Sequence, residues 1–192
     1  PAVAGVGNIR IDYQNGIRQA VQHLAALRHV RIAFVSGPLH LKSALARKSA
    51  FEESMREIGL EVLPGLMAVG DHTMEGGMRA LAKLAGLHER PTGIVCSNDM
   101  SAIGVMREAY DCGISIPRDL SVVGFDDIRL AQFMTPPLTT VQMSQSELAK
   151  LAFHALINEV QLQPAAPPTG SEYRLNTNLI LRKSTALAPP HN

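Results

Sequence analysis

The chain has 192 residues, of which 46% are hydrophobic and 18% charged, and its formal net charge is +1. This length and balance are typical of a globular chain with a buried core in one or two compact lobes. The sequence contains neither a polybasic run nor an apolar run of membrane-spanning length. Composition therefore predicts neither nucleic-acid binding nor membrane binding by this chain.

The cysteines and the first residue bear on the cellular compartment. Cys96 and Cys112 are the only cysteines, at an expected strand end and late in an expected helix, which favours reduced thiols over a disulfide framework. Pro1 begins the chain with neither an initiator methionine nor a signal-peptide pattern. We therefore expect a cytoplasmic protein of which this chain is a piece.

Strands and helices alternate along the first two thirds of the chain. An early helix is predicted with Ile17, Val21 and Leu24 on its apolar face. Short apolar segments then recur about every 30 residues and predict buried strands. They are residues 32–35, 66–69, 93–96 and 121–125. This alternation predicts an α/β fold with a mostly parallel sheet covered by helices on both faces.

The segments between these strands carry apolar residues on one helical face, and a glycine follows each of them. At Gly59, Gly86 and Gly113 we expect left-handed helix caps, because glycine lacks a Cβ.

Polar residues follow each predicted strand directly. They are Ser36 and Gly37; Asp71 and His72; Ser97, Asn98 and Asp99; and Asp126 and Asp127. Because the carboxyl ends of parallel strands lie along one edge of a sheet, these groups indicate a polar ligand site there. The alternative is that Asp and Asn only cap the helices that follow, which alone would explain Asn98 or Asp99.

The pattern changes after Asp127. Residues 135–141 predict an extended crossing strand, residues 144–162 a helix capped by Ser144 or Ser146, and residues 163–170 a proline-rich loop. Residues 173–181 alternate like one late strand, and we expect the tail after Thr185 to be disordered.

Nearly the whole chain, residues 12–185, resembles the effector-binding domain of LacI-type bacterial transcription regulators. The resemblance rests on the order and spacing of several motifs. They are residues 32–38 ending in Ser-Gly-Pro, Arg47 followed by Phe51, Asn98-Asp99 before a helix, Ile116-Pro117 leading into residues 121–127, residues 137–141, and the run from Leu181 to Thr185. It implies a periplasmic-binding-protein-like fold of two similar parallel-sheet lobes with the effector held between them.

On that template the chain contains the complete carboxyl-terminal lobe and only part of the amino-terminal lobe. Residues 13–143 and 173–185 would form the first, residues 1–12 and 144–172 would be a remnant of the second, and residues 186–192 a tail. Operator DNA would be bound only through a helix-turn-helix head absent from this chain.

The resemblance implies a ligand-binding set of Arg47, Asp126, Asn98, His72 and Ser43. The guanidinium of Arg47 can bridge two adjacent hydroxyls or a carboxylate, and an ionised Asp126 can accept from two donors. Without the resemblance, Arg47 at the start of its helix would be interpreted as a solvated charge. Asp99 is expected to be the helix cap, and Asp127 a turn or cap residue.

Family likeness also implies a homodimer whose interface includes Met74, Met78 and Met106, although a core stripe explains these methionines equally well. No third acid accompanies Asp126 and Asp127, so we expect no metal site and no cofactor. The other histidines form no metal-ligand pair and are expected at surface or helix positions.

Two classes of function compete with a sugar-sensing repressor domain. A periplasmic sugar-binding protein of a transport system shares the fold, but the sequence shows no sign of secretion. An enzyme ranks third, because Gly5-Val6-Gly7 lacks the third glycine of a dinucleotide loop and no nucleophile motif is present.

Overall fold

Six strands form the central sheet in the computed structural model, which describes residues 8–161 and 172–190. The strand order is β3-β2-β4-β5-β6-β8, and all neighbours are parallel except β6 and β8. The strands are β2 (Ile32–Ser36), β3 (Met67–Val69), β4 (Gly93–Cys96), β5 (Ser121–Asp126), β6 (Thr139–Gln142) and β8 (Asn178–Ile180). The predicted α/β class and the four early strands are confirmed to within one residue at each end, except that Leu66 ends the short 3-10 helix η1 (Pro64–Leu66).

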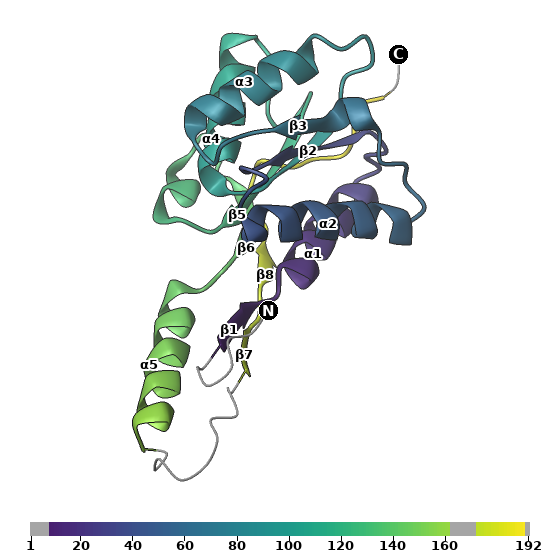
Figure 1. Cartoon of the computed structure of the whole chain (residues 1–192). Helices are drawn as coiled ribbons and strands as arrows, with labels where there is room; N and C mark the ends of the chain where they lie inside the picture. The colour runs from purple at the N-terminus through teal and green to yellow at the C-terminus, as the bar shows by residue number, and fades with distance from the viewer. Residues whose placement is uncertain (1–7, 162–171, 191–192) are drawn as a thin grey trace.

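Helices cover both faces of this sheet, as Figure 1 shows. The pair α1 (Tyr13–Ala26) and α2 (Lys42–Glu57) packs on one face, and α3 (Met74–Ala85) and α4 (Asp99–Asp111) on the other. Strand β2 serves both layers, since Phe34 faces α1 and α2 whereas Val35 faces α3 and α4. Continuous burial of β2 explains why its sequence is apolar without alternation.

Helices α3 and α4 approach each other at two glycines. A Cβ at Gly77 would lie 2.1 Å from the Ser101 carbonyl oxygen, and a Cβ at Gly104 would lie 1.9 Å from the Met74 carbonyl oxygen. Any side chain at either position would therefore push the two backbones apart.

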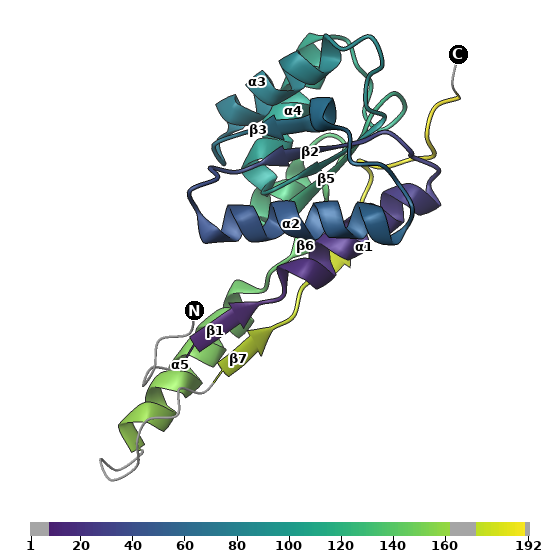
Figure 2. The same cartoon turned by 45° about the vertical axis from the view of Figure 1, so that its right-hand side comes forward.

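The six-stranded sheet and helices α1 to α4 form one lobe, and an arm extends from it (Figures 1 and 2). It consists of the parallel pair β1 (Asn8–Ile11) and β7 (Glu172–Leu175), with α5 (Gln145–Gln161) lying against both strands. Asp12 ties the arm to the lobe, because it caps α1 by accepting from the Asn15 N–H and also pairs with Arg174. On α5 the Phe153 side chain is 62% exposed, so this helix keeps apolar surface outside the lobe.

The late strand predicted at residues 173–181 is two strands in two different sheets. The chain leaves β7 and turns at Thr177, whose hydroxyl donates to the Asp12 carbonyl oxygen and whose carbonyl oxygen accepts from the Asn15 amide. These contacts span more than 160 residues of sequence, so the alternation pattern could not report the break.

The prediction that the tail after Thr185 is disordered is wrong. Beyond Thr185 the chain is ordered through residue 190: the Ala186 N–H donates to Ser121 Oγ, and the Ala188 N–H to the Leu27 carbonyl oxygen. His29 is not a surface residue, because it is 1% exposed and hydrogen-bonds both Thr92 Oγ1 and the Ala186 carbonyl oxygen.

Smaller differences concern helix ends. Gly59 and Gly113 have φ of 74° and 71°, as expected for left-handed caps, but Gly86 ends α3 in the right-handed helical region at φ −79°. Ser144 Oγ accepts from the Glu147 N–H and so caps α5. The predicted loop at residues 163–170 and the predicted helix end at Leu162 lie outside the described residues.

Candidate functional site

Arg47 lies in the second turn of α2 and points toward the carboxyl edge of the sheet, so it does not start the helix as expected. Its guanidinium donates to the Ser97 carbonyl oxygen just beyond β4, and its Nη2 lies 3.4 Å from Asp126 Oδ1 at the end of β5. Its side chain is only 8% exposed. A buried arginine needs such partners, and these two bring the ends of adjacent strands to one cation.

The guanidinium of Arg47 contacts two aromatic rings. These contacts were not predicted from the sequence. The Arg47 Cζ lies 4.8 Å from the centroid of the Tyr13 ring and 4.3 Å from that of Phe125. Cation–π attraction of this kind is strongest where water is excluded. The Arg47 Nε is buried and forms no hydrogen bond within the described residues. An aromatic residue directly after the helix-capping Asp12 was the only available signal for Tyr13.

Asp126 and Asp127 have separate partners. Asp126 (φ 114°) faces Arg47, whereas Asp127 (φ 55°) accepts from Arg182 at 2.6 Å and from Gln142 at 2.9 Å. Burial raises the pKa of Asp126, and the nearby Arg47 offsets part of that rise. Asp127 is therefore a structural ion-pair partner of Arg182, while the Asp126 carboxylate faces Arg47.

His72 follows β3 and lies at the same carboxyl edge of the sheet, next to Ser97. A Cβ at Gly37 would lie 1.8 Å from His72 Nε2, so the imidazole packs directly on the Gly37 backbone. Nε2 also lies 2.9 Å from Ser97 Oγ. Burial and the charge of Arg47 lower the pKa of His72, so the neutral ring is favoured at neutral pH.

Asn98 takes the capping role that the sequence suggested for Asp99. Asn98 is the cap of α4, accepting from the Ser101 N–H, and its amide donates to the His72 carbonyl oxygen. Asp99 does not cap the helix: its fully buried carboxyl accepts from the Thr140 hydroxyl at 2.5 Å and from the Ile128 N–H at 2.8 Å. Burial, with the charges of Asp126 and Asp127 adding to it, raises the pKa of Asp99 to about 7.

Ser43 lies one helical turn before Arg47 but faces a different space. It lines a cavity of about 1050 Å³ between α2 and the arm, together with Tyr13 and Lys42. Arg47, Asp126, Asn98 and His72 do not line this cavity. Tyr13 both lines this cavity and contacts Arg47. It therefore connects the cavity with the Arg47 cluster, which consists of Arg47, Asp126, Tyr13 and Phe125.

Of the three methionines expected at a dimer interface, Met106 is buried, whereas Met74 and Met78 are partly buried. Met106 is 5% exposed within the core cluster under α3 and α4, and Met74 packs against that cluster. Exposed apolar side chains occur on α4 at Tyr110 and on η2 (Arg129–Phe133) at Leu130 and Phe133.

Residues 8–161 and 172–190 contain neither a cluster of metal-ligating side chains nor a membrane-spanning helix. No group of three or more His, Cys, Asp or Glu side chains there is arranged to hold a metal ion. In the same ranges no helix has both the length and the apolar character needed to cross a bilayer.

Comparison with known proteins assigns the fold. The model of the periplasmic binding protein-like domain family matches residues 21–185. The chain is 36% identical over 162 residues to the ribose operon repressor of Escherichia coli, covering 84% of this chain and 48% of that protein. It is 35% identical over 182 residues to the Escherichia coli repressor CytR, covering 94% of this chain and 52% of that protein.

Solved structures agree. A LacI family regulator from Enterococcus faecium with bound ribose superposes with a TM-score of 0.86 at 26% identity, covering 97% of this chain and 68% of that one. The lac repressor dimer bound to operator and the anti-inducer ONPF gives 0.85 at 28% identity, covering 95% and 62%.

The chain therefore belongs to the periplasmic binding protein-like domain family. The similar proteins named above are transcriptional repressors and a LacI family regulator. It spans about half the length of the curated relatives it matches.

Proposed function

We propose that this chain senses a small polar effector, a sugar or a sugar derivative, for a LacI-type transcriptional repressor. The observation that carries the proposal is the Arg47–Asp126 pair at the carboxyl edge of the parallel sheet, with 3.4 Å between its atoms. The planar fork of donors and the neighbouring carboxylate acceptor complement adjacent sugar hydroxyls, each of which both donates and accepts. The repressors among its relatives favour this function over a periplasmic transport protein and over an enzyme.

The arm supports a two-lobe arrangement. In the proposed division, residues 13–143 and 173–185 form the carboxyl-terminal lobe, whereas residues 1–12 and 144–172 belong to the amino-terminal lobe. An effector bound between lobes would shift their closed and open populations, and the shift would reach operator DNA through a head outside this chain. We place this regulator in the cytoplasm as a homodimer.

The test is ligand-dependent thermal stabilisation of the full-length gene product with a panel of pentoses, hexoses, disaccharides and nucleosides. Binding at a hundredfold excess over Kd stabilises a protein by about 2.7 kcal/mol. We expect one panel member to raise the Tm of the wild type, and Arg47→Ala and Asp126→Ala to abolish that rise. Arg79→Ala is the matched control, because Arg79 is 63% exposed and pairs with Asp71.

Two results would contradict the proposal. The first is a Tm rise that persists in both Arg47→Ala and Asp126→Ala. The second is the absence of any Tm rise across the whole panel.

A further inference from the structure

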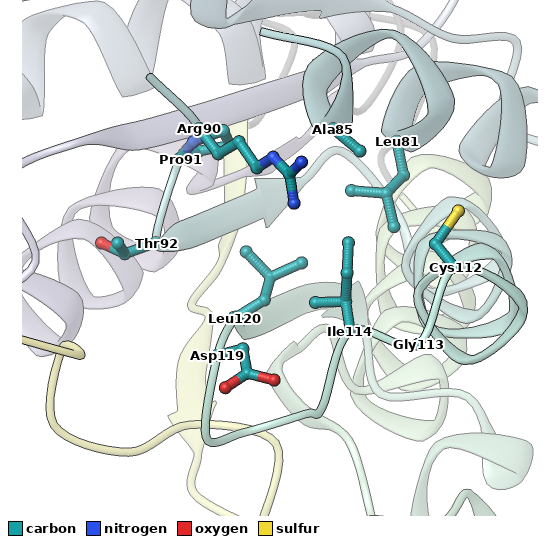
Figure 3. Close-up of a pocket in the computed structure, with 10 residues that line it drawn as sticks. All are labelled: Leu81, Ala85, Arg90, Pro91, Thr92, Cys112, Gly113, Ile114, Asp119 and Leu120. Atoms are coloured by element: carbon teal, nitrogen blue, oxygen red, sulfur yellow. The ribbon is translucent and has the colours of Figure 1, made fainter. Parts of the chain in front are cut away.

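We propose that the amino-terminal edge of the sheet carries a second ligand site, which takes a small carboxylic acid with an apolar body. A cavity of about 300 Å³ lies there, between the ends of α3 and α4 and the starts of β4 and β5 (Figure 3). The Arg47 cluster occupies the opposite, carboxyl edge. The two sites are therefore separated by the length of the strands, and this proposal does not depend on the first.

The floor of the cavity is apolar. Leu81 and Leu120 are 2% and 3% exposed and belong to the core cluster beneath, and Ile114 packs against the same cluster. Figure 3 shows these three side chains converging on the centre of the cavity. Covering such a surface with a hydrocarbon group is favourable because it removes apolar area from water.

Most polar side chains around this floor already have partners. Asp119 accepts from the Ser115 N–H at 2.9 Å and from Arg118 at 3.0 Å, so its charge is compensated. The Thr92 hydroxyl is hydrogen-bonded to His29 at 2.9 Å. The Cys112 thiol faces Glu108, with 3.5 Å between Sγ and Oε1.

Arg90 is the exception. Its guanidinium reaches over the apolar floor in Figure 3, and among the described residues it forms no ion pair or side-chain hydrogen bond. The Arg90 carbonyl oxygen accepts from Arg31, whose guanidinium also pairs with the Glu89 carboxylate. A free guanidinium beside a compensated Asp119 gives the cavity a positive charge, and a carboxylate matches its donor fork.

Size narrows the ligand class. A volume of about 300 Å³ is at the lower end of small-molecule pockets. It suits a branched aliphatic or single-ring aromatic acid, with the ring or chain on Leu81, Ile114 and Leu120 and the carboxylate on Arg90.

The experiment titrates the 192-residue chain with phenylacetate and with its neutral analogue phenylacetamide, by calorimetry and by amide chemical shifts. We expect phenylacetate to bind saturably and phenylacetamide to bind about tenfold more weakly, because the charge-assisted contact with Arg90 is lost. The shifted amides should be those of residues 81–92 and 112–121.

Two variants separate charge from shape. Arg90→Gln should weaken phenylacetate binding about tenfold while leaving phenylacetamide binding unchanged. Ala85→Leu should block both ligands by filling the cavity at the end of α3. Arg79→Gln is the control, because Arg79 lies on α3 but already pairs with Asp71.

Three outcomes would overturn the inference. They are no saturable binding of phenylacetate, equal affinity for the acid and the amide, and shifts centred on the carboxyl edge around Ser97 and Asp126.

Discussion

Asp99 is fully buried, and both groups that donate to its carboxyl are neutral. Its pKa of about 7 lies above the ordinary value of 3.8 because burial disfavours the charged form. Between about pH 4 and about pH 7 the folded protein therefore holds a proton on Asp99 that the unfolded chain has released. The free energy of unfolding consequently falls as pH rises through this window.

We predict that Asp99→Asn removes this pH dependence. An asparagine can still accept from the Ile128 N–H, and its amide can donate to the oxygen of the Thr140 hydroxyl, which in the wild type donates to Asp99. Urea unfolding from about pH 5 to about pH 8 should show the wild type losing about 2–3 kcal/mol relative to the variant, since about two pH units of the window are scanned at about 1.4 kcal/mol each.

Asp71→Asn provides the control. Hydrogen bonds from Thr73 lower the pKa of Asp71, so its titration lies below about pH 4 and outside this window. Equal slopes for Asp99→Asn and the wild type would show that Asp99 is charged throughout.

The residues of the site differ in how far sequence could identify them. Arg47 came from the resemblance, and Asp126 came both from its position after a predicted strand and from the resemblance; the structure brings the two into contact. The partners of Asp99 lie 29 and 41 residues away, so nothing local distinguished it from the helix cap Asn98. Phe125 was recognised only as a strand residue, because its contact with Arg47 arises from the packing of α2 on the sheet.

At the scale of elements, the crossing of α3 and α4 depends on having no side chain at Gly104. We predict that Gly104→Ala lowers the free energy of unfolding by about 1–3 kcal/mol, because the added methyl would meet the Met74 backbone. Gly86→Ala is the matched control: its nearest neighbour would be 3.6 Å away and its φ is negative. That variant should be neutral or stabilising by up to about 1 kcal/mol in the same urea titration. Equal effects of the two substitutions would argue against close packing at this crossing.

Elements with continuous local signals were predictable, and those defined by distant contacts were not. Strands β2, β4 and β5 are apolar between their end residues because helices cover both of their faces. The break at Thr177 and the order after Thr185 depend on hydrogen bonds to residues near the beginning and the middle of the chain. Composition around these segments gives no sign of such partners.

At the scale of the whole molecule, Met106 is buried, so we expect a dimer contact to use exposed aromatic side chains of α4 and η2. Phe133 is 65% exposed and Tyr110 79%, on the sheet face that α4 and η2 cover. We predict that Phe133→Ser shifts sedimentation of the full-length gene product from dimer toward monomer. Phe153→Ser, on the arm, is the control at similar exposure and should leave the dimer intact. A monomeric wild type, or an unaffected Phe133→Ser dimer, would contradict this surface.

The pairing of β1 with β7 has a consequence for the order of folding. Asn8 pairs with Glu172, so this ladder joins distant parts of the chain, whereas β4 lies between β2 and β5 in the middle of the sheet. Closing so long a loop is entropically costly, and the arm adds little apolar burial in return. We expect the arm to form last and to open first, with amide hydrogens of β1 and β7 exchanging well before those of β4 in native-state exchange. Equal protection of the two regions would mean that lobe and arm unfold as one cooperative unit.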